Sequence, residues 1–430
     1  MPVEGFPHLR VTRWLSTLQQ EVDTRAAARQ WVQSAAREAK RGWRAELTRL
    51  SGEKHAWRPR LEHCIGLLAE LTEFRGVPET EVPDNYVFWK RALGVYPVTR
   101  WMAQPFINRY HRDMTARMEE AGVEPAVRYL PPRIEGRAPV PARFSRNPLE
   151  VPAPGEYATR ALLHHYAPAL APGADNPDNR PGRIRLWADR PDVDTGETPA
   201  YYWSSWTRFE GRALLQLNYK FWFTRRPPQQ SLDLYAGELD SVIWRVTLKP
   251  DGSVLFYDSI HSCGCYHKVF PVDPSLKEAE EIPGDRPVFA PEHAPDARDT
   301  RVELLLEPDT HYLVAVSALE PDEGIEEREY HLRDADVLRR LPRNDDPEQG
   351  FDSLYDHRGL IPASRRPERW VLWPLGIRSA GAMRQPGTHA IAFIGRRHFD
   401  DPELPDILFE REQADSARGP LRTTTRSTVR

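Results

Sequence analysis

The chain has 430 residues, of which 40% are hydrophobic and 28% are charged, and its formal net charge is −4. These fractions are typical of a folded globular protein and exclude an intrinsically disordered one. Without a long basic stripe the charge pattern excludes a nucleic-acid-binding protein, and no apolar run reaches the roughly 18 residues of a membrane span. We therefore expect the partner to be a small molecule or a protein.

The length exceeds the roughly 250–300 residues at which one hydrophobic core stops growing, so two domains are expected. The first residues, MPVEGFPHLRVTRW, lack the apolar segment of a secretory signal. The default prediction is a cytoplasmic bacterial protein, although a mature periplasmic form whose signal has been removed would look the same. Three cysteines, Cys64, Cys263 and Cys265, are too few for a disulfide scaffold.

Residues 1–122 are predicted to form a helical domain. Between residues 24 and 50, apolar residues recur at intervals of three and four, which is the pattern of one apolar helix face. Residues 61–74 and 106–121 are predicted to be further helices. Because this region holds few candidate catalytic groups, we expect a helical bundle or a docking platform.

Residues 123–155 are predicted to be an extended linker between two domains. Proline removes a backbone donor and fixes φ, so neither a helix nor a central strand is expected here. The prolines that carry this prediction are Pro125, Pro131, Pro132, Pro139, Pro141, Pro148, Pro152 and Pro154.

Residues 156–413 are predicted to form a β-rich domain with a short C-terminal α/β subdomain, and residues 414–430 a disordered tail. Aromatic and β-branched residues predict strands at 201–209, 213–223, 241–249, 253–260, 301–307 and 312–319. A short helix is expected at 334–341, with further strands at 370–377 and 389–394. The fold class is therefore α+β, a helical N-terminal domain followed by a mainly antiparallel β-sandwich-like domain.

The segment after the fourth predicted strand reads His261-Ser-Cys-Gly-Cys-Tyr-His267. If the chain stays extended, the two-residue period puts His261, Cys263, Cys265 and His267 on one face. Two imidazoles and two thiolates are a zinc ligand set that also suits Cu(I). One flat strand spaces these side chains about 6.5–7 Å apart, too far for all four to reach one ion. A bend at Gly264 and ligands from another strand are therefore expected.

His311, at the start of a strand after the turn at 307–310, is the expected outside ligand of this zinc or copper site. Two alternatives remain. Cys263 and Cys265 could be a redox pair, whose disulfide would be strained and easily reduced. They could also be small structural thiols beside satisfied histidines. Asp258 is expected on the face opposite His261, where it accepts from a neighbouring strand.

The run GELDSVIWRVTLKPDGSVLFYDSIH, residues 237–261, resembles the core of the Vps62-like family of β-sandwich proteins. In that family a strand with aspartate and tryptophan, a turn and a strand that ends in histidine recur. Asp240, Trp244 and His261 stand at these places. The resemblance implies a sandwich fold without a settled biochemical activity.

The working hypothesis is a metal-binding β-sandwich protein that, as an enzyme, would carry out metal-assisted hydrolysis. Three protein ligands would leave an open coordination position for water, and Glu238 or Asp240 would be the catalytic general base. The alternative is a non-enzymatic binding or envelope protein in which the Cys-Gly-Cys segment is structural or redox-active.

Overall fold

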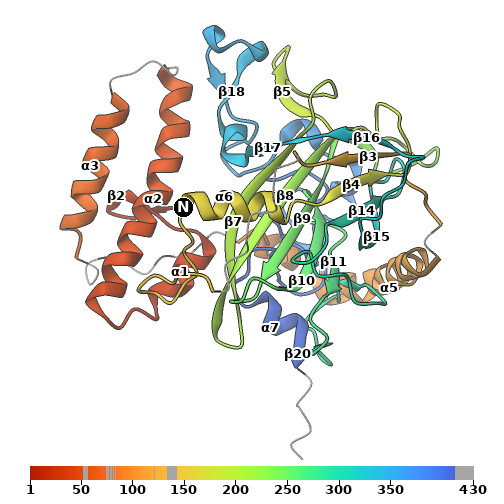
Figure 1. Ribbon diagram of the computed structural model, residues 1–430, viewed down its shortest axis with the longest axis horizontal. Helices are drawn as coiled ribbons and strands as arrows, with labels where there is room; N and C mark the ends of the chain where they lie inside the picture. The colour runs from red at the N-terminus through yellow and green to blue at the C-terminus, as the bar shows by residue number, and fades with distance from the viewer. Residues whose placement is uncertain are drawn as a thin grey trace, which may run out of the picture.

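The computed structural model describes residues 1–51, 57–73, 77, 80, 82, 84–120, 122–132 and 143–411 (Figure 1). The predicted tail and part of the predicted linker lie outside these ranges. The fold is α+β, as predicted, with a mainly helical N-terminal region and mixed, mostly antiparallel sheets in the remainder. In the part of the chain that the structure describes, no helix is long and apolar enough to cross a membrane.

The N-terminal region contains a small two-stranded sheet and long helices. Its elements are β1 (Pro2–Val3), β2 (Phe6–Arg10), α1 (Arg13–Gln19), α2 (Arg25–Ser51) and α3 (Trp57–Leu71). The predicted apolar stripe is real: Trp31, Val32 and Ala35 are buried in a core that α2 shares with α1 and β2. Helix α2 therefore owes its position to one apolar face.

Two further helices follow, α4 (Phe88–Leu93) and α5 (Tyr96–Glu120), and α5 lies at the lower right in Figure 1. Met114 and Met118, near the end of α5, belong to the same core as the large β-sheets. Helix α6 (Glu156–His165) follows and contributes Leu162 and Leu163 to that core. Whether residues 1–122 fold as a separate domain stays a prediction.

A seven-stranded sheet holds the predicted motif. Its order is β13 (Val288–Phe289), β11 (Lys268–Pro271), β10 (Val254–His261), β9 (Gly237–Leu248), β8 (Arg212–Arg226), β7 (Pro199–Phe209) and β17 (His331–Asp334). The strands β7 to β11 are consecutive antiparallel neighbours. This meander confirms the four strands predicted between 201 and 260.

A five-stranded sheet lies in front of it in Figure 1. Its order is β15 (Leu313–Ala318), β14 (Val302–Leu306), β4 (Ala169–Pro172), β3 (Val127–Leu130) and β16 (Glu326–Glu329). Strand β3 corrects the prediction that the proline-rich segment contains no central strand. The four residues of β3 lie between Pro125 and Pro131, so none of their backbone donors is missing.

The two sheets share one hydrophobic core, which gives the sandwich-like arrangement that was predicted. Alternate residues of β8 and β9, such as Leu217 and Trp244, meet Tyr129 of β3 and Leu304 of β14 in this core. The opposite face of the seven-stranded sheet is covered by the C-terminal segment, including α7 (Leu404–Leu408). Side chains on both faces of β9 and β10 are therefore buried.

Two C-terminal strand predictions are wrong. Residues 370–377 contain the last residue of one 3-10 helix, η6 (Pro367–Trp370), and the whole of another, η7 (Trp373–Leu375). Residues 389–394 form only the isolated bridge from Ala390 to His398. Prolines at the start of both helices remove ladder donors. The helix predicted at 334–341 exists as the 3-10 helix η2 (Ala335–Arg339).

Shorter elements complete the fold. They are β5 (Arg183–Trp187) with β6 (Arg190–Asp194), β12 (Leu276–Glu278) with β20 (Phe409–Arg411), β18 (Leu341–Pro342) with β19 (Phe351–Asp352), and the 3-10 helices η3 (Arg343–Asp345), η4 (Pro347–Gln349) and η5 (Pro362–Ser364).

Candidate functional site

The predicted metal motif is a tight loop and not an extended strand. Strand β10 ends at His261, whose backbone N–H donates to the carbonyl oxygen of Cys265 at 3.0 Å. Gly264 has φ +91°, and a Cβ there would lie 2.2 Å from the carbonyl oxygen of Ala390, so only glycine fits. The predicted bend at Gly264 is confirmed. The shared face of His261, Cys263, Cys265 and His267 was expected only for an extended chain, and that condition is not met, because the strand stops before the cysteines.

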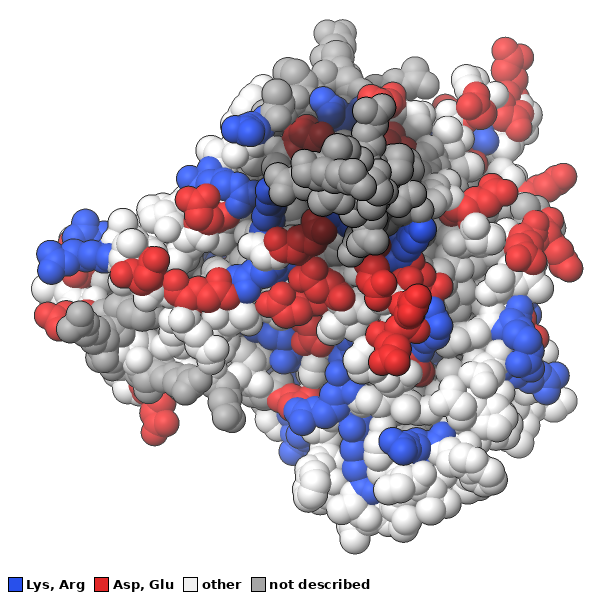
Figure 2. Space-filling view, turned by 90° about the horizontal axis from the view of Figure 1, so that it is seen from below, with Lys and Arg blue, Asp and Glu red and all other residues white. Residues whose placement is uncertain are grey.

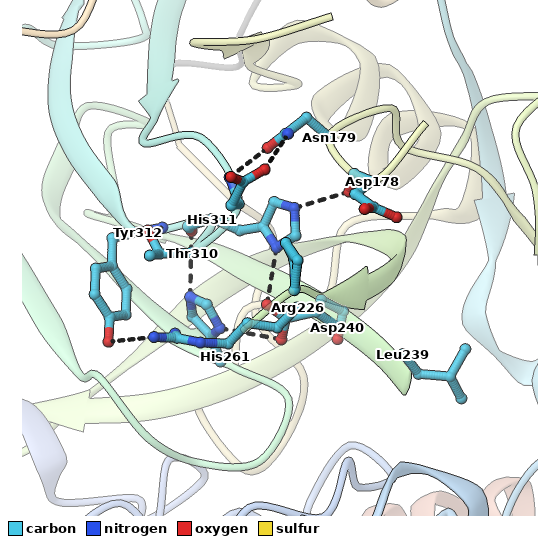
Figure 3. A network of polar contacts seen from close by, with 12 residues as sticks. Asp178, Asn179, Arg226, Leu239, Asp240, His261, Thr310, His311 and Tyr312 are labelled. Carbon is cyan, nitrogen blue, oxygen red and sulfur yellow. Dashed lines mark hydrogen bonds and ion pairs between the residues drawn. The ribbon is translucent and has the colours of Figure 1, made fainter. Parts of the chain in front are cut away.

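Asp240 of β9 is the centre of a buried polar cluster (Figure 3). Its Oδ1 atom lies 3.2 Å from Nδ1 of His261 and 3.2 Å from Nη2 of Arg366, and its Oδ2 atom lies 2.9 Å from Nδ1 of His311. Burial alone would raise the pKa of Asp240, but the charges of His261 and Arg366 and the histidine hydrogen bonds hold it well below its usual value. Asp240 is therefore an anion in the protein interior.

His311 lies in the turn between β14 and β15, which places its imidazole beside Asp240. The Nε2 atom of His311 lies 3.0 Å from the carbonyl oxygen of Asp178, and its ring stacks on Phe223 at 4.0 Å between centroids. Asn179 exchanges two hydrogen bonds with Asp309 in the same turn, at 2.7 and 2.9 Å. The predicted partner residue is thus fixed from three sides, and its imidazole is linked to that of His261 through the carboxylate of Asp240.

His267 lies on the other face of the sheet, away from His261. Its Nε2 atom is 3.2 Å from Oδ2 of Asp258, which also pairs with Arg245. Burial lowers the pKa of His267, whereas Asp258 opposes that shift. The expected position of Asp258, opposite His261 and facing a neighbouring strand, is confirmed.

The residues of the motif do not fit a metal ion in this arrangement. Both ring nitrogens of His261 already face protein oxygens, namely Asp240 Oδ1 and the carbonyl oxygen of His311, each at 3.2 Å. Both ring nitrogens of His311 are engaged in the same way. Within the described ranges, no group of three His, Cys, Asp or Glu side chains is placed to hold a metal ion. A zinc or copper site therefore stays a prediction that the geometry does not support.

Cys263 and Cys265 form a buried pair of free thiols. The backbone N–H of Cys265 donates to Sγ of Cys263 at 3.3 Å. A hydrogen bond with Cys263, together with burial, raises the pKa of the Cys265 thiol well above its ordinary value. A thiol with a raised pKa supplies little thiolate, which is the reactive form. These contacts favour the structural alternative over the redox alternative.

Arg226, at the end of β8, lies in a cage of aromatic rings beside Asp240. Its guanidinium carbon is 5.0 Å from the ring centre of Tyr312, 5.7 Å from that of Tyr266 and 5.9 Å from that of Tyr235. Cation–π attraction stabilises the charge there, but it satisfies none of the N–H donors. Nη2 donates to the Tyr312 hydroxyl at 3.3 Å, whereas Nε and Nη1 have no hydrogen-bond partner among the described residues.

Arg366, between η5 and η6, also has buried N–H donors without hydrogen-bond partners among the described residues. Its side chain is fully buried, and Nη2 bonds to the carbonyl oxygen of Leu239 and to Asp240. Its Nε and Nη1 atoms have no partner in the described part of the chain. Four N–H-bearing atoms of Arg226 and Arg366 are thus buried and unpaired, and each such donor costs about 1–3 kcal/mol unless it is satisfied. The two arginines and Asp240 together carry one excess positive charge, which an anion, or Glu368 in its ionised form, would offset.

Two further ionisable residues near the cluster titrate close to neutral pH. Burial raises the pKa of Glu368 to about 7, against the opposing charges of Arg366 and Arg226. Burial lowers the pKa of Lys268, at the start of β11, to about 7, and its Nζ atom lies 5.0 Å from the ring centre of Tyr312. Groups whose pKa values lie near 7 can accept or release protons at neutral pH, which is typical of active sites.

The backbone is strained at three buried or half-buried positions of the cluster. Leu239, Tyr266 and His311 have φ values of 60°, 63° and 52°. Residues other than glycine rarely adopt positive φ, at a cost on the order of 1–3 kcal/mol each. Such strain concentrates at functional sites, so the cluster is the strongest candidate site in the described chain.

The two predicted general bases, Asp240 and Glu238, lie in different environments. Asp240 lies at the centre of the cluster, whereas the side chain of Glu238 is exposed at the start of β9. Prediction missed Arg226, Arg366, Tyr266 and Glu368. Nothing in the sequence marked Arg366 as a candidate site residue, because the chain contains 52 arginines. Lys268 could have been identified, since it is one of only seven lysines and stands directly before the apolar residues Val269 and Phe270.

Comparison with known proteins gives no further support. No family model, curated protein or solved structure matches this chain. The Vps62-like resemblance therefore stays a prediction, and the candidate function depends on the geometry alone.

Proposed function

We propose that the protein binds a small acidic molecule, one that carries a carboxylate or phosphate group, in the buried cluster around Asp240. The observation that carries the proposal is the set of four unpaired N–H-bearing atoms of Arg226 and Arg366. Arginine presents its donors in a planar fork that matches the oxygens of carboxylates and phosphates. An acidic ligand would satisfy these donors and neutralise the excess positive charge.

The aromatic residues around Arg226 support the same proposal. Tyr110 of α5 packs against Tyr266 and Tyr312, with ring centres 5.6 and 6.3 Å apart. Its hydroxyl has no hydrogen-bond partner among the described residues. Ligand sites are mostly apolar and aromatic, with a few polar groups that converge on the ligand. The cluster has this composition.

A second candidate function is acid–base catalysis on the bound acid. The observation that favours it is the pair of pKa values near 7, for Glu368 and Lys268. At neutral pH a part of each population can donate a proton and a part can accept one. Metal-dependent hydrolysis remains a separate prediction, and elemental analysis of protein prepared without chelators tests it.

The proposal is tested by thermal unfolding with inorganic phosphate and with a series of mono- and dicarboxylic acids, each paired with its neutral amide. A ligand at 100 times its Kd should stabilise the fold by about 2.7 kcal/mol. We expect at least one acid, and no amide, to raise the Tm. The Arg366→Gln variant should lose this response. Arg365→Gln is the matched control, because Arg365 is exposed.

Two results would contradict the proposal. One is that no acid raises the Tm more than its amide does. The other is an Arg366→Gln variant that folds and still responds like the parent. If Arg366→Gln does not fold, Arg226→Gln provides the second variant, since the side chain of Arg226 makes one hydrogen bond among the described residues.

A further inference from the structure

The segment of α4 and α5 exposes a series of large apolar side chains. Phe88 is 85% exposed, and Trp101 and Phe106 are each 76% exposed. The members of this α4–α5 patch are Phe88, Trp89, Leu93, Val95, Val98, Trp101, Met102 and Phe106. Monomeric soluble proteins rarely expose large contiguous apolar areas, and those that do occur mark interaction sites.

The patch has a fixed geometry because the segment is anchored from its other side. Arg91 donates to the carbonyl oxygens of Leu375 and Gly395 at 2.9 and 2.6 Å. Its guanidinium also lies over the rings of Tyr86 and Tyr96, at 4.7 and 4.4 Å from their centres. The exposed side chains are thus presented outward by a packed support.

The two halves of α5 differ in what covers their apolar residues. In the first half, Val98, Trp101, Met102 and Phe106 recur at intervals of three and four and are exposed. In the second half, Tyr110, Met114 and Met118 contribute to the β core. A surface helix needs an apolar stripe only where it packs on the core, so the exposed apolar residues of the first half have a role that folding does not explain.

The segment that carries the patch contains charges of one sign. Residues 85–112 contain no aspartate or glutamate, and their basic residues are Lys90, Arg91, Arg100, Arg109 and Arg112. Arg109 lies 3.8 Å from Asp113, just outside this segment. The whole chain has a net charge of −4, so this segment stands out. Figure 2 shows acidic side chains gathered in the centre and upper part of the view, whereas the lower part is mostly uncharged with scattered Lys and Arg.

We propose that the α4–α5 patch docks on a lipid bilayer that contains anionic lipids. Tryptophan and phenylalanine insert at the boundary between headgroups and acyl chains. Lysine and arginine near the surface are attracted to anionic headgroups. A second copy of this chain is a weaker candidate, because a twofold interface would bring the basic segment of one copy against the same segment of the other.

The experiment is co-sedimentation of the full chain with two kinds of vesicle, phosphatidylcholine alone and phosphatidylcholine with 30% phosphatidylglycerol as the chosen probe. We expect binding to the anionic vesicles that weakens at high salt. The Trp101→Ser/Phe106→Ser variant should lose at least about tenfold in vesicle affinity. The control Tyr157→Ser/Leu232→Ser changes two exposed side chains outside the patch and should bind like the parent.

Light scattering of the parent and the Trp101→Ser/Phe106→Ser variant without vesicles separates the two occupants. A monomeric parent that binds anionic vesicles supports the proposal. A parent dimer that dissociates in the variant would show that a second copy covers the patch, and would overturn it. Absence of vesicle binding, or equal loss of binding in the control variant, would overturn it too. The Tm of each variant shows whether it is folded.

Discussion

Two carboxylates of the seven-stranded sheet, Asp240 and Asp258, are buried on opposite faces with the same kinds of partner, histidine and arginine. Arg245 makes two bonds to Asp258, one of 2.8 Å, and its remaining terminal nitrogen donates to the carbonyl oxygen of Phe399. In the other cluster, Arg366 uses only one nitrogen, and Nε and Nη1 have no described partner. Residue type alone therefore does not separate a structural cluster from a candidate site.

The difference lies in how many donors are satisfied. All nitrogens of Arg245 are paired within the fold, so the Asp258 cluster is complete apart from Nδ1 of His267. The Asp240 cluster leaves donors of two arginines unpaired, in a strained backbone. A cluster whose donors are all satisfied is stable without a ligand. A cluster with unpaired buried donors becomes more stable when a ligand satisfies them.

The largest expected loss of stability follows a substitution in the Asp258 cluster. Arg245→Met should lower the free energy of unfolding by about 3–5 kcal/mol, because it leaves Asp258 as a poorly compensated buried charge. Denaturant unfolding measures this. The control Arg286→Met removes an exposed ion pair with Glu278 and should cost less than about 1 kcal/mol.

The matching change in the incomplete cluster should cost less. Arg366→Met is expected to lower the free energy of unfolding by about 1–2 kcal/mol, because two unpaired donors are removed with the charge and Asp240 keeps both histidines. The same denaturant experiment checks it. A loss as large as that of Arg245→Met would mean that the two clusters are equally structural.

A third prediction concerns Lys268 and the pH dependence of the free energy of unfolding. Burial lowers the pKa of Lys268 to about 7, whereas the unfolded chain keeps a value near 10.4. Above about pH 7 the unfolded state thus binds a proton that the folded state does not, so this residue makes stability rise with pH. Replacing Lys268 by Met should lower the slope between pH 7 and pH 9 by up to about 1.4 kcal/mol per pH unit.

Unfolding curves at pH 7, 8 and 9 give the slope for the parent and for each variant. Lys277→Met is the control, because Lys277 is exposed and should leave the slope unchanged. An Lys268→Met slope equal to that of the parent would show that Lys268 is charged in the folded protein.

The smallest expected effect concerns the thiols. Cys64 is exposed, whereas Cys263 and Cys265 are buried. A chromogenic thiol reagent should therefore modify one cysteine per native chain and three per unfolded chain, without a reductant. One reactive thiol in the unfolded chain would instead indicate a Cys263–Cys265 disulfide and would support the redox alternative.

Sequence patterns predicted much of the fold and only part of the site. The strands between residues 201 and 260 were predictable because they are dense in apolar residues. Successive side chains point alternately into the two cores on either side of the sheet. The strand predictions at 370–377 and 389–394 failed. Pro374, at the start of η7, removes a ladder donor, and residues 389–394 make only the isolated bridge from Ala390 to His398. For the site, His261, His311 and Asp240 were identifiable as rare polar residues in or beside strands. Arg366 comes from a loop 126 residues from Asp240, and only tertiary contact reveals it.

The most direct test of the central claim is a crystal of the protein soaked in selenate, an anion whose selenium atom is located by anomalous diffraction. We expect a selenium peak that places selenate oxygens within hydrogen-bond distance of Nε or Nη1 of Arg226 and Arg366. The Arg366→Gln variant should lose this peak. Ordered water alone on these donors, or a side chain of the protein that satisfies them, would contradict the claim that the cluster is completed by an acidic ligand.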